Sequence, residues 1–373
     1  MPAPGQEHPK HMLDKRTLNR ALLARQWLLE RSPASAYEAL EHLVGLQAQA
    51  PNPPYFALWT RLSEFSQQDL SELIGSRRAV RIALQRATLH LVSDRDWLRL
   101  RPVLQAVQDR AVNGAFGRRL EGLDLDAAAA AGRSLVKDRP LTLGQLGAKL
   151  AGLWSEREPA ALANAVRAAV PLVQVPPRGI WGSSGQAAHT SAEAWIGRPL
   201  AAEREPDELL LRYLRAFGPA TVQDMQVWSG LTRLKETVDR LEPQLVTFLS
   251  EDGRILYDLP DAPRPDSSTP APVRFLSEFD SMLLSYEDRS RILDPAYKAR
   301  LFTGNGIIRA AFLVNGFVQG KWSLELHREK AVLVLDPFIR ISAQTKEELE
   351  TEGLCLLAFA APGADIREIQ WKS

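Results

Sequence analysis

The sequence predicts an α+β protein made of three tandem winged helix-turn-helix modules and a C-terminal β-barrel-like domain. One observation is a repeated order of elements, because residues 121–200 and 201–262 each read as three helices followed by two strands. Another is the proline- and serine-rich stretch 263–272, which is typical of a linker. Beyond that linker, residues 273–373 are β-rich, and FLVNGFVQGKWSLEL alternates polar and apolar side chains, which predicts an antiparallel sheet or a small barrel.

The second and third modules carry the clearest patterns. In residues 121–200 the segments DLDAAAAAGRSLVKD, TLGQLGAKLAGL and EPAALANAVRAAV predict helices, and PLVQVPPRGIWGSSG predicts a strand, a turn and a strand. In residues 201–262 the helices are DELLLRYLRAFG, TVQDMQVWSG and LTRLKETVDRLEP. LVTFLSEDGRILYDL then predicts a hairpin that turns at Asp252-Gly253.

The two ends of the chain are less regular. Residues 13–120 predict a helical first module with one strand over Thr88–Val92 and no clear second strand. Residues 1–12 are polar and predict a flexible tail. In the C-terminal domain CLLAFA is counted with the β-rich segments, and Cys355 within it is expected in the core.

Composition narrows the class of protein. The chain has 373 residues, 45% hydrophobic and 24% charged, so wholesale disorder is excluded. No apolar stretch is long enough for a membrane span, and the N-terminus lacks a signal-peptide core. A single cysteine excludes a disulfide framework and a cysteine-based zinc site, and the six histidines form no HExxH pair. We therefore expect a cytoplasmic protein with no membrane span and no dedicated metal. We also expect a monomer without a cofactor.

The basic residues are unevenly distributed. The net charge is +1, but residues 1–120 hold 17 Lys and Arg against 11 Asp and Glu. Arg77, Arg78, Arg81 and Arg86 cluster near the predicted strand. The cluster is either a face that binds a polyanion such as DNA or a solvated surface.

Two glutamines stand where an apolar helix meets the break PNPP. If the backbone is extended there, Gln47 and Gln49 point the same way and form one polar patch. That patch would lie beside Tyr55, Trp59 and Arg61. The alternative is that both amides bond the free carbonyls at the helix end.

The sequence resembles the bacterial winged-helix family of alkylpurine DNA glycosylases, the AlkZ and YcaQ type. The resemblance runs from about Leu18 to the C-terminus and is carried by five segments: LVGLQAQAPNPPYFALWTRL, RATLHLVSDRDW, PLVQVPPRGIWGSSG, RYLRAFGPATVQDMQVWSGL and APVRFLSEFDSMLLSYEDRSRI. The family signature is Gln–aliphatic–Gln in the AlkZ branch and Gln–aliphatic–Asp in the YcaQ branch. Gln47-Ala48-Gln49 is similar to the former.

The resemblance implies a monofunctional DNA glycosylase that acts on N7-alkylated purines in duplex DNA, including bulky adducts. Some family members unhook interstrand crosslinks or protect antibiotic producers from their own genotoxin. It implies Gln47 and Gln49 as the catalytic pair. An amide is not a base, but an N7-alkylated base is already cationic and leaves neutral, so the protein need only position water. The expected location is the cytoplasm, on the nucleoid.

Further residues are expected to contact DNA or sense the lesion. The alternative is a structural role, in packing or on the solvated surface. These residues are Asn52, Tyr55, Arg61, Arg86, His90, Arg178, Trp181, His189 and Thr190. The segment around Arg178 and Trp181 would probe the minor groove or the gap at a lesion too bulky to flip. Asp280 either supports a Gln or Arg side chain or caps a turn.

Two other functions remain open from the residues. A non-catalytic winged-helix regulator would bind an operator and release no base, but the third helices are poor in base-reading side chains. A protein that sequesters a DNA-reactive compound would bind the small molecule without DNA.

Overall fold

The computed structural model describes residues 11–372. By internal contacts the chain divides into two compact units, and each is described by itself. Unit 1 comprises residues up to 32, 207–227 and 233–373, whereas unit 2 comprises residues 33–206 and 228–232. The division into a tail, three modules, a linker and a C-terminal domain stays a prediction. Residues 1–10 of the predicted tail lie outside the described residues. Met12 already belongs to a strand.

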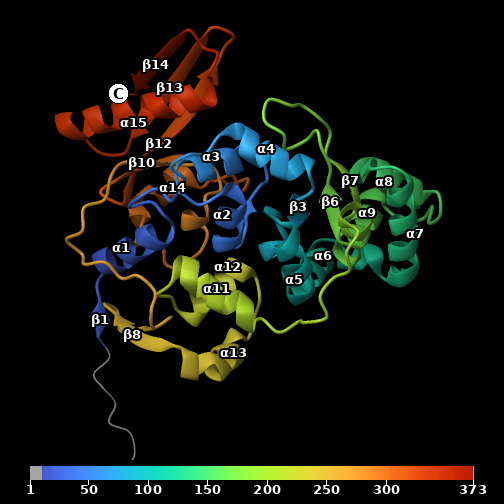
Figure 1. Cartoon of the computed structure of the whole chain (residues 1–373). Helices are drawn as coiled ribbons and strands as arrows, with labels where there is room; N and C mark the ends of the chain where they lie inside the picture. The colour runs from blue at the N-terminus through green and yellow to red at the C-terminus, as the bar shows by residue number, and fades with distance from the viewer. Residues whose placement is uncertain (1–10, 373) are drawn as a thin grey trace, which may run out of the picture. The chain divides into compact units, whose positions relative to one another are not determined.

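Unit 2 is built around one six-stranded sheet with the strand order β2-β4-β3-β6-β7-β5, all pairs antiparallel (Figure 1). Its strands are β2 (Leu46–Gln47), β3 (Ala79–Ala83), β4 (Leu89–Ser93), β5 (Leu141–Thr142), β6 (Leu172–Gln174) and β7 (Ala188–Ser191). Its helices are α2 (Ala36–His42), α3 (Pro53–Trp59), α4 (Gln67–Gly75), η1 (Gln85–Ala87), α5 (Asp94–Val103), α6 (Gln105–Leu120), α7 (Leu125–Asp138), α8 (Leu143–Ala151), α9 (Pro159–Ala169) and α10 (Ala192–Ile196).

Local signals explain several of these elements. α7, α8 and α9 lie where their segments predict helices, and α8 begins at a capping box formed by Thr142 and Gln145. The three helices pack around one apolar cluster, whose buried members are Val136, Leu141, Leu146, Leu150, Leu162, Val166, Val170 and Leu172. This burial removes the apolar face of each helix from water.

Two predictions for unit 2 need correction. A second strand does follow α4 in the first module, because β3 pairs with β4 along its whole length. The segment PLVQVPPRGIWGSSG contains only the strand β6, and the second strand, β7, begins after it at Ala188. β3 also pairs with β6, so the first two predicted modules share one sheet. The winged-helix assignment and the count of three stay predictions.

The described residues of unit 1 form two sheets. A small sheet has the order β1-β8-β9, and a five-stranded sheet has the order β10-β11-β12-β13-β14. The strands are β1 (Met12–Leu13), β8 (Val246–Ser250), β9 (Ile255–Asp258), β10 (Arg274–Leu276), β11 (Ala311–Val314), β12 (Phe317–Leu326), β13 (Lys330–Pro337) and β14 (Ile366–Trp371). The helices are α1 (Lys15–Arg25), α11 (Asp207–Phe217), α12 (Val222–Ser229, up to residue 227), α13 (Leu234–Leu241), η2 (Glu242–Gln244), η3 (Ser281–Leu283), η4 (Pro295–Tyr297), α14 (Lys298–Leu301) and α15 (Ala343–Ala360).

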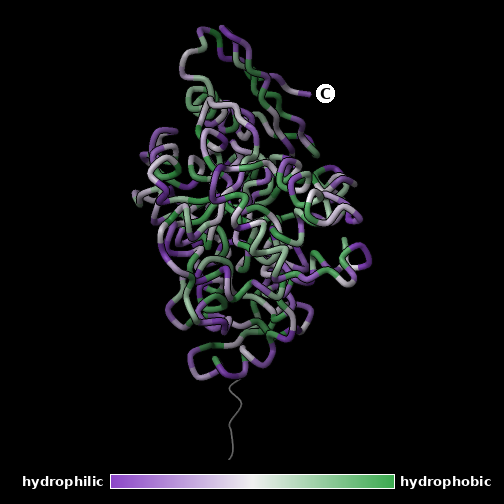
Figure 2. Tube along the Cα trace, turned by 90° about the vertical axis from the view of Figure 1, so that its right-hand side faces the viewer, coloured by the Kyte–Doolittle hydropathy of each residue, from purple (hydrophilic) through white to green (hydrophobic). Residues whose placement is uncertain are grey.

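The C-terminal sheet is open, which corrects the predicted barrel. β10 and β14 are its edges and do not pair with each other. In Figure 2 hydrophobic stretches recur along its strands, beside the C-terminus. CLLAFA belongs to the helix α15 instead of a strand, and Cys355 is exposed on that helix instead of in the core. A short apolar run fits either type of element, and here the run continues a longer helix.

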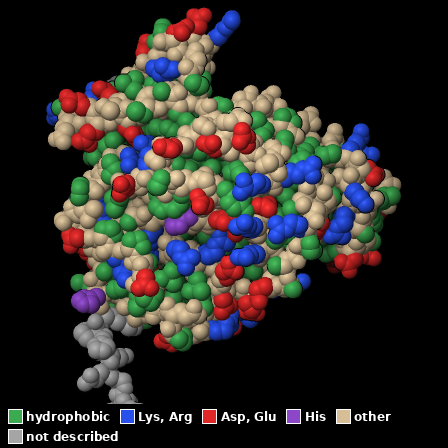
Figure 3. Space-filling view, viewed as in Figure 1, with side chains coloured by type: hydrophobic (Ala, Val, Ile, Leu, Met, Phe, Trp, Pro, Cys, Tyr) green, Lys and Arg blue, Asp and Glu red, His purple; other side chains and the backbone are tan. Residues whose placement is uncertain are grey.

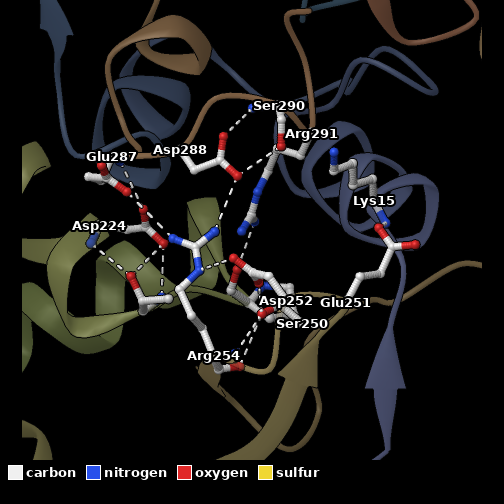
Figure 4. A network of polar contacts seen from close by, with 12 residues as sticks. Lys15, Asp224, Ser250, Glu251, Asp252, Arg254, Glu287, Asp288, Ser290 and Arg291 are labelled. Carbon is white, nitrogen blue, oxygen red and sulfur yellow. Dashed lines mark hydrogen bonds and ion pairs between the residues drawn. The ribbon is translucent and has the colours of Figure 1, made fainter. Parts of the chain in front are cut away.

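Ion pairs join distant parts of unit 1, one of them buried and another partly exposed. Arg25 makes a two-pronged ion pair with Asp258, at 2.7 and 2.8 Å, and both side chains are fully buried. Figure 4 shows a second network, in which Arg254 contacts Asp252, Glu287 and Asp288. Since these carboxylates already have partners in the network, we assign it to structure.

Candidate nucleic-acid site around Gln47 and Gln49

Gln47 ends the edge strand β2 of unit 2. The chain reaches that strand from α2 through a tight turn, in which Gly45 has φ +86° and its missing Cβ would lie 2.5 Å from Val92 Cγ1. Only glycine fits there, because a side chain would need both a left-handed backbone and space that Val92 fills. In the β2–β4 pair Gln47 lies opposite His90.

The two glutamines differ in environment. The Gln47 side chain is 8% exposed, and its Oε1 accepts a hydrogen bond of 2.7 Å from Nη2 of Arg86. Gln49 lies two residues beyond the end of β2 and is exposed. Its side chain makes no hydrogen bond within the described part of the chain. The prediction that Gln47 and Gln49 point the same way required an extended strand through Gln49, whereas β2 ends at Gln47.

Arg81 holds the backbone on both sides of Gln49. From β3 it donates Nη2 to Ala48 O at 2.7 Å and Nη1 to Ala50 O at 3.4 Å, while Nε donates to Gln174 Oε1 at 3.2 Å. Burial lowers the pKa of Arg81 to about 10, so it stays charged near neutral pH. Sequence reasoning placed Arg81 in a surface cluster and missed this role, because the contact joins strands that are distant in the chain.

Arg86 turns inward from the short helix η1. Its backbone is left-handed, with φ 54° and ψ 19°, a conformation that costs a non-glycine residue about 1–2 kcal/mol. Besides Gln47, its guanidinium donates to the backbone oxygen of Trp228. Arg86 is thus held by two acceptors within unit 2, which is a different environment from the predicted solvent-facing DNA contact.

His90 is a buried neutral imidazole beside this pair. Its ring is 4% exposed, and Nδ1 lies 3.0 Å from Thr88 O. A carbonyl only accepts, so Nδ1 carries the proton and Nε2 keeps its lone pair. Burial, and then the nearby positive charge of Arg86, lower the pKa of His90 to about 3. The site therefore adds no second positive charge at neutral pH.

Three of the predicted contact residues are buried and engaged in packing. The Tyr55 hydroxyl donates to Gly179 O at 2.8 Å, and burial raises its pKa. Arg61 is fully buried just beyond the end of α3, and its side chain donates to Ala57 O in that helix. Thr190 donates to Val136 O at 3.0 Å, which joins β7 to α7. These environments support a role in stability, not in contacting DNA.

Three of the other residues predicted to contact DNA lie in or next to the β6–β7 connection, and the fourth lies at the start of α3. Trp181 packs against Tyr55 with ring centroids 4.9 Å apart, so the connection folds back on α3 (Figure 1). Arg178 is half-buried and donates to Gly185 O. His189 is buried, and burial lowers its pKa to about 4. Asn52 is exposed at the start of α3, without a side-chain capping bond.

Asp280 belongs to unit 1, where it caps a turn. Its carboxylate accepts a hydrogen bond of 3.1 Å from Met282 N at the start of η3. This is the turn-capping contact that the sequence offered as one of the two alternatives.

Exposed arginines accompany the site on unit 2. Figure 3 shows Lys and Arg side chains gathered over the region where Figure 1 draws β3 and α5. Arg77 and Arg78 are exposed and stack on Trp195 and Tyr37, at 4.1 and 4.4 Å from the ring centroids. Of the predicted basic cluster, these two remain available to a phosphate backbone.

The described residues hold no group of three or more His, Cys, Asp or Glu side chains placed to bind a metal ion. Within residues 11–372 no helix is both long and apolar enough to cross a membrane.

The comparisons with known proteins identify the class as DNA glycosylases, because a family model described as DNA glycosylase AlkZ-like matches residues 40–359. The chain belongs to the AlkZ-like DNA glycosylase family, which confirms the resemblance stated from the sequence. Among solved structures, the Streptomyces sahachiroi DNA glycosylase AlkZ is similar in fold, with a TM-score of 0.77. The identity is 20%, and the match covers 97% of this chain and 100% of that one. No curated protein matches the sequence.

Proposed function

We propose that this DNA glycosylase hydrolyses the N-glycosidic bond of N7-alkylated purines in duplex DNA, bulky adducts included. The observation that carries the proposal is the exposed amide of Gln49, held between two anchored carbonyls and next to Gln47. A rigid backbone with an unengaged polar side chain suits the positioning of a water molecule.

The proposed reaction needs no acid and no strong base. Water attacks C1′ of the damaged nucleotide, and the C1′–N9 bond breaks. The electron pair of that bond passes to the cationic base, which leaves neutral, and the attacking water loses a proton to solvent. The products are the free alkylated purine and an abasic site.

The side chains of the site are assigned by their chemistry. The Gln49 carbonyl oxygen accepts a hydrogen bond from the attacking water, as an amide can without acting as a base. The carboxamide of Gln47 lines the same turn in a fixed orientation, because Arg86 engages its oxygen. His90 stays neutral and does not repel the cationic base.

Exposed arginines and the β6–β7 connection complete the proposed DNA contacts. Arg77 and Arg78 would hold phosphates, and the exposed tip of the connection, residues 182–184, would meet the duplex near the lesion. A crosslinked base cannot flip into a pocket, so excision at an open surface would also act on crosslinked bases.

Base release decides the proposal. One labelled duplex carries a single N7-methylguanine and another a bulky N7 adduct, and abasic sites are revealed by alkaline cleavage. We expect release by the wild type from both, and a loss of about 10²-fold in Gln47→Ala and Gln49→Ala, with DNA affinity retained. Gln344→Ala, an exposed glutamine on α15, is the matched control.

Tight DNA binding without release from either duplex would contradict the proposal and favour a non-catalytic regulator. Release from N7-methylguanine alone would restrict the substrate to small adducts.

A further inference from the structure

Arg86 joins the candidate site to a distant segment of the chain. One end of its guanidinium donates to Gln47 Oε1 and the other to the backbone oxygen of Trp228. These two acceptors come from segments far apart in sequence. A phosphate contact would instead need the guanidinium to face solvent.

Residues 228–232 pack closely against Arg86. They belong to unit 2, although the residues on either side of them belong to unit 1. Gly230 has φ +81°, and a Cβ there would lie 3.1 Å from both Cα and N of Arg86. Val107 of α6 would be equally close, at 3.0 Å. Glycine therefore lets this segment lie directly on the backbone of Arg86.

A second arginine anchors the same segment from α6. Arg110 donates to Gly230 O and, at 3.2 Å, to the Thr232 hydroxyl. The segment is thus fixed on one side by Arg110 and on the other by Arg86. Because Arg86 has a left-handed backbone, contacts of this kind must outweigh the conformational cost.

The consequence for Gln47 is a defined orientation of its carboxamide. A guanidinium only donates, so the amide oxygen of Gln47 must face Arg86 and its NH₂ group must face away. His90, opposite Gln47 on β4, is neutral and offers no competing cation.

We propose that Arg86 is a positioning residue, which holds Gln47 in one orientation for base release and is itself supported by residues 228–232. This inference rests on the proposed function, because it assigns Arg86 a role through Gln47. Contact of Arg86 with the DNA backbone is the competing explanation.

A double-mutant cycle separates the two explanations. Single-turnover base release from the N7-methylguanine duplex is measured for the wild type, Arg86→Met, Gln47→Ala and the double variant. We expect Arg86→Met to lower the maximal rate about 10- to 100-fold without weakening DNA binding, and to cost little more when Gln47 is already alanine. Arg86→Lys keeps one donor and should recover part of the rate.

Arg233 provides a matched control. It also has a left-handed backbone, with φ 60°, but its side chain is exposed. Arg233→Met should leave the rate at the wild-type value. If Arg86→Met does not fold, as judged by circular dichroism, the same cycle is run with Arg86→Lys and with Gly230→Ala, which displaces Arg86 without replacing it.

Each outcome has one meaning. Independent, multiplying losses for Arg86 and Gln47, or weaker binding to undamaged DNA with a smaller salt dependence, would overturn the positioning role. If the wild type releases no base, the proposed function itself is lost. If Gln47→Ala is inactive while Arg86→Met is fully active, only this inference fails.

Discussion

Arg86 Nη2 donates a hydrogen bond to Gln47 Oε1 at 2.7 Å, which places a part-buried arginine beside one of the two glutamines of the motif. The other glutamine, Gln49, is exposed and lies between carbonyls that Arg81 holds. Two arginines of the predicted basic surface therefore support the motif from inside the protein. The motif is consequently asymmetric, with one glutamine built into the fold and one presented to solvent.

This asymmetry predicts different effects on stability. Gln47→Ala removes the acceptor of Nη2 of the part-buried Arg86 and should lower the free energy of unfolding by about 1–3 kcal/mol. Gln49→Ala removes an exposed side chain and should change it by less than about 0.5 kcal/mol. Urea unfolding of both variants measures the difference, and equal values would contradict the asymmetry.

Arg81→Met should impair both stability and base release. The variant keeps an unbranched aliphatic stem but removes the donors to Ala48 O and Ala50 O. We expect a loss of about 2–4 kcal/mol in the free energy of unfolding, since each buried acceptor left unpaired costs about 1–3 kcal/mol. The maximal rate should fall about 10-fold or more because Gln49 is no longer held. Arg78→Met, at an exposed arginine near Arg81, is the control. Equal losses of stability and rate in both variants would contradict a specific role of Arg81.

Buried histidines should make the protein less stable in mild acid. The pKa values of His90 and His189 in the folded chain are about 3 and about 4, below the ordinary value of 6.5. Between the folded pKa values and 6.5 the unfolded chain binds more protons than the folded chain. The free energy of unfolding that the neutral histidines contribute is therefore fully present above pH 6.5 and is lost as the pH falls. Each histidine contributes up to about 1.4 kcal/mol per pH unit in its window.

Urea unfolding at about pH 7, 6 and 5 measures this slope, which the linkage relation makes positive with pH. His90→Gln should flatten it, whereas His327→Gln, at an exposed histidine, should not. A slope unchanged by His90→Gln would show that the imidazole is not held neutral.

The rate of base release should be nearly independent of pH between about 6 and 8. Gln47 and Gln49 do not titrate, and His90 is neutral throughout this range. The measurement is the single-turnover rate on the N7-methylguanine duplex in a constant-ionic-strength buffer series. A limb with an apparent pKa inside this range would point to a carboxylate or imidazole acting as general base.

Local sequence signals determined much of the helical structure. α7, α8 and α9 were predictable because each has apolar residues at helical spacing, and α8 also has a capping box. The β8–β9 hairpin followed from Asp252-Gly253, with Gly253 at φ +78°. The glutamine motif was also visible, because its resemblance to a family depends only on neighbouring residues.

Only the tertiary structure decided which residues surround that motif. The Arg81–Gln174 contact joins residues 93 positions apart, and the pairing of β3 with β6 brings them together. The same holds for Trp228, whose backbone oxygen receives the Arg86 guanidinium. Periodicity reports whether a side chain is buried but not against what, since strand pairing and the burial of a charge depend on partners brought from distant segments. For that reason the sequence identified the two glutamines, whereas the folded chain alone distinguished the buried one from the exposed one.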